Sequence, residues 1–126
     1  MMEKFMRKSL VVVPALAVSL FLACAGPAFG HGTVESASPR NGATLAKPPA
    51  EIRLRFNEPL EPAFTSVKVF DAAGKAVTIA GKARVEDGKT VVLPLPVLPP
   101  GGYKAQWTSV GHDGHRVRGE LTFTVK

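Results

Sequence analysis

The strongest constraint on the fold is a series of short segments in which apolar and polar residues alternate. In EIRLRF the side chains of Ile52, Leu54 and Phe56 fall on one side of an extended chain, and charged side chains fall on the other. The same period of two recurs in TSVKVFD around Val67 and Val69. Pro, Gly, Asn or Asp bounds each segment, and no helical period competes. This pattern predicts an all-β protein.

Seven such segments can be counted, with GTVESASP as the first. KARVEDGKTVVLPL predicts a hairpin, because Asp87 and Gly88 can adopt the positive φ angles of a tight turn. Tyr103 and Trp107 alternate along one strand, so we expect them in the core rather than on a ligand platform. The last strand places three apolar side chains on its core face: Leu121, Phe123 and Val125. We therefore predict a seven-stranded Greek-key β-sandwich, immunoglobulin-like or of the cupredoxin-like barrel type.

The first 30 residues have the composition of a cleavable secretory signal. Basic residues precede an apolar run from Leu10 to Ala25, and Ala28-Phe29-Gly30 is a small-x-small cleavage site. We expect residues 1–30 to be removed and residues 31–126 to form one soluble domain. A retained membrane anchor and a lipoprotein acylated at Cys24 are the alternatives.

The expected mature chain has 96 residues, enough for one small domain. Its 13 basic and 9 acidic residues leave a net charge of +4, spread along the chain, which argues against a nucleic-acid partner. Cys24 and the three methionines, Met1, Met2 and Met6, all precede residue 31. The domain therefore has no disulfide, no thiolate nucleophile and no sulfur ligand for a metal.

Cleavage after Gly30 would make His31 the first residue, with an α-amine and an imidazole that can chelate one metal ion together. Their reference pKa values, about 7.7 to 8.0 and about 6.5, allow both groups to lose a proton to a metal near neutral pH. The other two histidines of the chain lie in its last segment, GHDGHRVRGELTFTVK. There, Asp113 and His115 would share one face of an extended chain, whereas His112 would point to the other.

In a sandwich the first strand can lie beside the loop before the last strand, so His31 can join Asp113 and His115 in one site. Nitrogen and carboxylate donors suit Cu(II), with Zn(II) or Ni(II) as alternatives in vitro. For His112, an exposed position or a supporting role is as well favoured as a ligand role. The simpler alternative is an ordinary hairpin turn at Asp113-Gly114 and a mobile terminus at His31.

These features together resemble the CopC family of periplasmic copper-resistance proteins. The shared motifs are HGTVESASPRNGATL, LRFNEPLEP and YKAQWTSVGHDGHRVRGELTFTV, and they span nearly all of the expected domain. The resemblance implies a seven-stranded Greek-key sandwich that binds one Cu(II) ion through His31, by its amine and imidazole, Asp113 and His115. It also implies a CopD-like inner-membrane protein as a partner. Some members bind Cu(I) through a methionine-rich loop, which this sequence lacks.

The favoured function is thus a monomeric periplasmic protein that buffers or delivers copper and is not an enzyme. One alternative is a copper-dependent oxidative enzyme, because an N-terminal histidine chelate also resembles the copper brace of lytic polysaccharide monooxygenases. A carboxylate ligand favours the oxidised ion, however, and few aromatic residues remain outside the expected core for a sugar-binding face. A metal-free immunoglobulin-like interaction module is the other alternative, if cleavage falls elsewhere.

Overall fold

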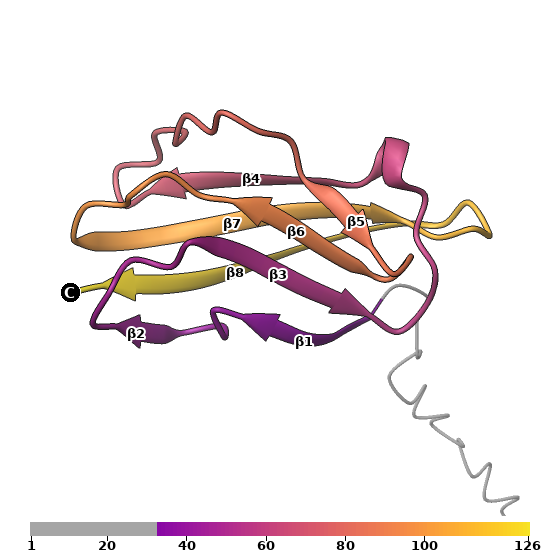
Figure 1. The fold of residues 1–126 in the computed structure, drawn as a ribbon, viewed down its shortest axis with the longest axis horizontal. Helices are drawn as coiled ribbons and strands as arrows, with labels where there is room; N and C mark the ends of the chain where they lie inside the picture. Colours follow the sequence, from indigo (N-terminus) through magenta and orange to yellow (C-terminus); the bar gives the residue numbers. More distant parts are fainter. Residues whose placement is uncertain (1–32) are drawn as a thin grey trace, which may run out of the picture.

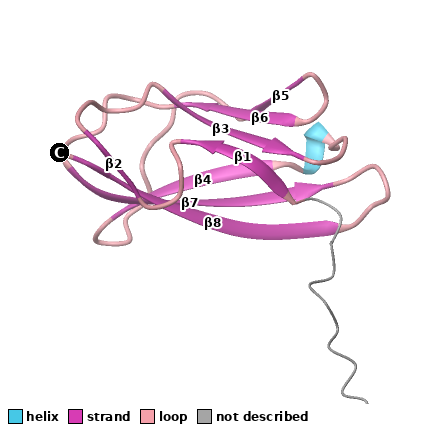
Figure 2. Ribbon diagram, turned by 90° about the horizontal axis from the view of Figure 1, so that it is seen from below, coloured by secondary structure: helices cyan, strands magenta, loops and turns pink. Residues whose placement is uncertain are grey.

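The computed structural model describes residues 33–126, which form two β-sheets packed face to face (Figures 1 and 2). The strand order is β1-β3-β6-β5 in the first sheet and β2-β8-β7-β4 in the second. In chain order the elements are β1 (Val34–Ser38), β2 (Ala43–Leu45), β3 (Glu51–Phe56), the 3₁₀ helix η1 (Pro62–Phe64), β4 (Ser66–Asp71), β5 (Arg84–Glu86), β6 (Thr90–Pro94), β7 (Gly101–Val110) and β8 (Arg116–Val125). The expected β-sandwich is confirmed. The predicted signal, residues 1–30, and His31 lie outside the described residues.

The core consists of the apolar side chains that the alternation placed on one face of each strand. Ile52, Leu54 and Phe56 of β3 are 0% exposed. Val67, Val69 and the three apolar residues of β8 are buried opposite them. Burial of each such side chain contributes about 1.5 to 3 kcal/mol relative to an exposed position, so these strands are held mainly by the core they share.

Tyr103 and Trp107 both pack inside the sandwich, as expected. Tyr103 is 8% exposed, and its ring stacks on Phe123 with the ring centres 5.5 Å apart. Trp107 is half-buried and meets Phe56 edge to face, at 5.1 Å and an interplanar angle of 80°. The first pair joins the neighbouring strands β7 and β8, and the second joins the two sheets. Neither Tyr103 nor Trp107 forms an exposed platform.

The predicted hairpin at Asp87-Gly88 is also confirmed. Asp87 has φ 48° and Gly88 has φ 75°, the two positive values that a tight turn between twisted strands requires. This turn joins β5 to β6, and the β7–β8 turn is the other connection between neighbouring strands of one sheet. The remaining connections cross between the sheets, as in a Greek-key sandwich.

The structure corrects the strand count from seven to eight. The additional strand, β2, has only three residues and pairs in parallel with β8. Such a segment is too short to show an alternating pattern, and its pairing depends on a strand about 80 residues away. The Asn41 side chain accepts a hydrogen bond from the Thr122 amide at 2.9 Å, and Lys126 N–H donates to the Leu45 carbonyl at 2.9 Å. These long-range bonds position β2.

One end of the sandwich collects several distant segments. There β1 begins, β3 ends, η1 lies and β7 turns into β8 (Figures 1 and 2). The β3–β4 loop is tied to the β7–β8 turn by the bridge between Leu60 and Gly111 and by the Glu61 N–H, which donates to Val110 O at 2.7 Å.

In residues 33–126 we find no helix with the length and apolar character of a membrane span.

Candidate metal centre

The β7–β8 turn holds the Asp113 and His115 pair in a compact loop rather than in extended chain. Gly114 N–H donates to Gly111 O at 2.9 Å, and Gly111 N–H donates to His115 O at 3.1 Å. These two backbone hydrogen bonds close the loop. Gly114 has φ 82°, in the left-handed region that glycine adopts without strain. The extended geometry assumed from the sequence is therefore replaced by a turn.

This turn nevertheless brings the two side chains together. The Asp113 carboxylate accepts the His115 backbone N–H at 3.0 Å through Oδ1, and its Oδ2 lies 2.9 Å from His115 Nδ1. An ionised carboxylate can only accept, so Nδ1 carries the proton of this hydrogen bond, and the neutral ring then has its lone pair on Nε2. The same bond raises the pKa of His115, with the charge of Asp113 adding to the effect.

Glu58 is a residue of this region to which the sequence analysis assigned no role. A Cβ built on Gly111 would lie 2.6 Å from Glu58 Oε1 and 3.0 Å from Asp113 Oδ1, so both carboxylates approach this glycine. The charge of Glu58 also contributes to the raised pKa of His115. The available sequence signal was the FNEP motif, but it did not show that the carboxylate reaches the β7–β8 turn.

His112 points to a different neighbour. Its Nε2 lies 3.7 Å from Glu61 Oε1, on the side of η1, and its side chain is 62% exposed. The side chains of His115 and Asp113 are 70% and 34% exposed. The turn therefore presents His115 and Asp113 to solvent, where an ion can reach them, and directs His112 toward Glu61.

The start of the described chain lies close to this turn. Thr33 N–H donates to Asn57 Oδ1 at 3.0 Å, and Asn57 N–H donates to Thr33 O at 3.0 Å, immediately before Glu58. Within residues 33–126 there is no group of three or more His, Cys, Asp or Glu side chains arranged to hold a metal ion. His31, the third ligand expected from the sequence, lies outside the described residues.

Known proteins agree with the resemblance inferred from the motifs. The CopC domain model matches residues 34–126. Copper resistance protein C of Pseudomonas syringae pv. tomato is 36% identical over 103 residues, which cover 76% of this chain and 81% of that protein. Copper transport protein CutJ of Bacillus subtilis (strain 168) is 30% identical over 100 residues, 77% of this chain. The match spans only 18% of CutJ, which is a much longer protein.

The fold has a close counterpart among solved structures. The crystal structure of CopC from Methylosinus trichosporium OB3b superposes with a TM-score of 0.71 at 32% sequence identity. The superposition covers 76% of this chain and 94% of that one. The overall architecture is thus shared with that protein.

Proposed function

Because the chain belongs to the CopC family, which includes copper resistance proteins, we propose that it binds one Cu(II) ion in the periplasm and buffers or delivers it. The observation that carries this proposal is the contact between Asp113 and His115 at the end of the sandwich where β1 begins. A nitrogen and a carboxylate donor are held together there, exposed to solvent.

The proposed ligands are His31, through its amine and imidazole, together with Asp113 and His115. Thr33 is hydrogen-bonded to Asn57 at this end of the sandwich. Two extended residues span about 7 Å, a length of chain that allows His31 to reach the β7–β8 turn. His115 would use Nε2, because Nδ1 is bonded to Asp113. A carboxylate has about four lone-pair positions, so Asp113 can hold His115 and also coordinate the ion.

The charge of the region favours a cation. Glu58 and Asp113 both approach Gly111, and Glu61 of the β3–β4 loop lies beside His112 of the β7–β8 turn. The ligand set has no sulfur, since the chain contains no methionine after Met6 and no cysteine after Cys24. Imidazole, amine and carboxylate donors suit Cu(II), whereas Cu(I) prefers thiolate and thioether, so we propose the oxidised ion as cargo.

We propose that the protein acts by binding copper and not as an enzyme. The aromatic residues Tyr103 and Trp107 pack in the sandwich, and among residues 33–126 the exposed large apolar side chains are Phe64 and Val97. This surface has little in common with a flat polysaccharide-binding face. A CopD-like membrane protein is the proposed recipient or source of the ion, and a monomer is the proposed state.

The first experiment is the intact mass of the protein recovered from the periplasm, with and without one equivalent of Cu(II) at pH 7. We expect the mass of residues 31–126 and the addition of one copper. A longer or acylated chain would remove the α-amine of His31 from the site. An unprocessed terminus with undiminished copper affinity would therefore contradict the proposed chelate.

The ligands are tested with three matched variants, His31→Ala, His115→Ala and His112→Ala, in a Cu(II) titration against a competing chelator. Loss of a direct ligand should weaken binding by more than about 100-fold, because loss of supporting groups alone typically costs 10- to 100-fold. His112→Ala is the control, since His112 faces Glu61, and it should change binding by less than about fivefold. Equal losses in all three variants would show that the ligands are assigned incorrectly.

A further inference from the structure

The two outer faces of the sandwich differ in how their charges are balanced. On the first sheet each arginine lies in ion pairs with neighbouring carboxylates. Arg53 pairs with Glu51 at 3.1 Å and with Glu86 at 2.8 Å. Arg55 lies 3.4 Å from Glu35 and 3.5 Å from Asp87, and Arg84 lies 3.0 Å from Glu86. The positive charge of this face is therefore compensated within the face.

The second sheet carries an uncompensated positive charge. Four exposed cations point outward from β4, β7 and β8, with one exposed carboxylate among them: Lys68, Lys104, Arg116, Arg118 and Glu120. Lys104 and Glu120 form an ion pair at 3.9 Å. Within residues 33–126 no carboxylate pairs with the other three cations. We call these five residues and the sheet surface between them the basic face.

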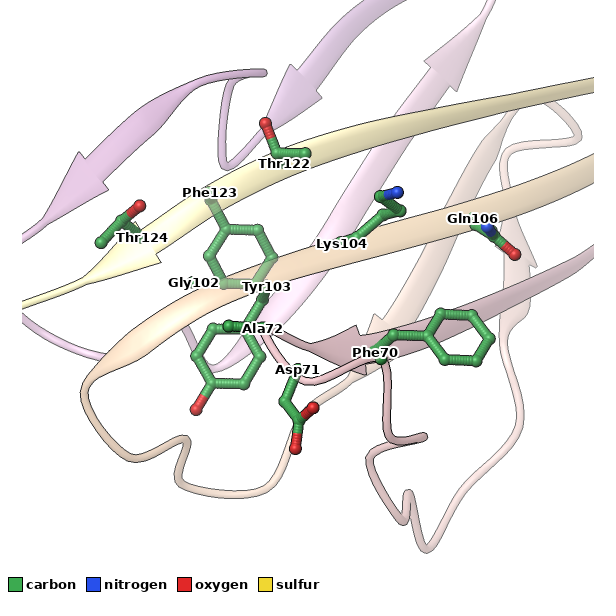
Figure 3. Close-up of a pocket in the computed structure, with 11 residues that line it drawn as sticks. Phe70, Asp71, Ala72, Gly102, Tyr103, Lys104, Gln106, Thr122, Phe123 and Thr124 are labelled. Carbon is green, nitrogen blue, oxygen red and sulfur yellow. The ribbon is translucent and has the colours of Figure 1, made fainter.

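The basic face is shallowly hollowed. Two depressions, of ≈ 600 and ≈ 540 Å³, adjoin at Gln106. Figure 3 shows the first, where Lys104 and Gln106 of β7 stand beside Phe70 of β4 and Thr122 of β8. Asp71 at its border is engaged in its own turn, because its Oδ1 accepts the amides of Ala73 and Lys75. The surface thus combines cations, a half-buried aromatic ring and short polar side chains.

We propose that the basic face is a docking surface for an acidic segment of a partner protein. The cations complement carboxylates, and arginine can bind a carboxylate with two parallel hydrogen bonds. A charged face of this kind mainly accelerates encounter and selects the partner. Phe70 and the hollow beside Lys104 favour a peptide segment over a flat lipid surface. Arg116 directly follows His115, so a partner seated there would lie next to the candidate metal centre.

The proposal is tested by NMR titration of the metal-free protein with a deca-glutamate peptide at low ionic strength. Because no metal is present, the outcome does not depend on copper binding. We expect amide shifts to concentrate on β4, β7 and β8, and the interaction to weaken as salt is added. Shifts spread evenly over all the basic residues would indicate a general charge effect and would overturn the proposal.

Two double variants with the same change in net charge provide the matched comparison. Lys68→Glu/Arg118→Glu reverses the basic face, whereas Lys47→Glu/Lys82→Glu changes exposed loops elsewhere. We expect the first to weaken peptide binding by at least fivefold and the second by less than twofold. If the first does not fold, Lys68→Gln/Arg118→Gln replaces it. Equal weakening, or binding to phosphatidylglycerol vesicles but not to the peptide, would refute an acidic protein partner.

Discussion

Gly119 of β8 is a position where adding a single methyl group should disturb the core. It lies opposite Trp107 in the β7–β8 register, and the indole ring crosses over it. A Cβ at Gly119 would lie 2.2 Å from Cζ2, 2.6 Å from Cε2 and 3.0 Å from Cη2 of Trp107. The ring has little room to retreat into the core, because it packs edge to face on Phe56, which is 0% exposed.

The expected cost of Gly119→Ala follows from two opposing effects. Forcing an extra methyl group into a packed core typically costs about 1 to 3 kcal/mol. Replacing glycine restricts the unfolded chain and returns about 0.4 to 1 kcal/mol. The difference between the two effects predicts that the free energy of unfolding falls by about 1 to 2 kcal/mol, and the Tm by about 4 to 16 °C for a domain of this size.

The assay is urea unfolding followed by the fluorescence of Trp107, the only tryptophan in the chain. Gly81→Ala is the matched control, because no atom lies within 4 Å of a Cβ at Gly81 and its φ is not positive. The control should leave stability unchanged or slightly higher. A Gly119→Ala protein within about 0.5 kcal/mol of wild type would show that the indole ring is not confined between Phe56 and β8.

Three further changes test other parts of the structure. Asp113→Asn should lower the pKa of His115 toward 6.5, as measured by NMR. Because folding raises the pKa of His115, its contact with Asp113 stabilises the folded protein below about pH 6.5, and this contribution is lost as the pH rises through the folded pKa. The loss of stability in Asp113→Asn relative to wild type should therefore be smaller at high pH. Gly88→Ala, at φ 75°, should cost about 1 to 2 kcal/mol in urea unfolding. Glu86→Gln should reduce the loss of stability on acidification below pH 4.5, because hydrogen bonds from Arg53 and Arg84 lower the pKa of Glu86; an unchanged acid transition would contradict this.

The raised pKa of His115 also bears on copper binding. A proton must leave the imidazole before the ion binds, so protons compete at a higher pH than they would for an unperturbed histidine. We expect the Cu(II) affinity to fall steeply below about pH 6, from the reference pKa values of the proposed ligands. A titration with the same affinity at pH 5 and pH 8 would count against the site.

The local features of the chain were predictable from its sequence. Strand β3, the core face of β8 and the turn at Asp87-Gly88 depend on side-chain period and on backbone angles of neighbouring residues. Asp113 and His115 were expected to lie on the same side of the chain, since only Gly114 separates them, but the hydrogen bond between them was not predicted. The sequence placed both side chains on one face of an extended chain, and that geometry is wrong, because the residues lie in a turn in which the Asp113 carboxylate accepts the His115 amide. His31 stays a prediction.

The features that depend on distant partners required the tertiary structure. Strand β2 exists because β8 provides its hydrogen bonds, and Glu58 reaches Gly111 because the β3–β4 loop is bridged to the β7–β8 turn. The separation of charge between the two outer faces has the same origin. The sequence shows charges spread along the chain, but only strand register determines that Arg53 meets Glu86 while Arg118 lies opposite Thr108. Side-chain period acts within one strand, whereas pairing between strands is decided by the packing of the whole domain.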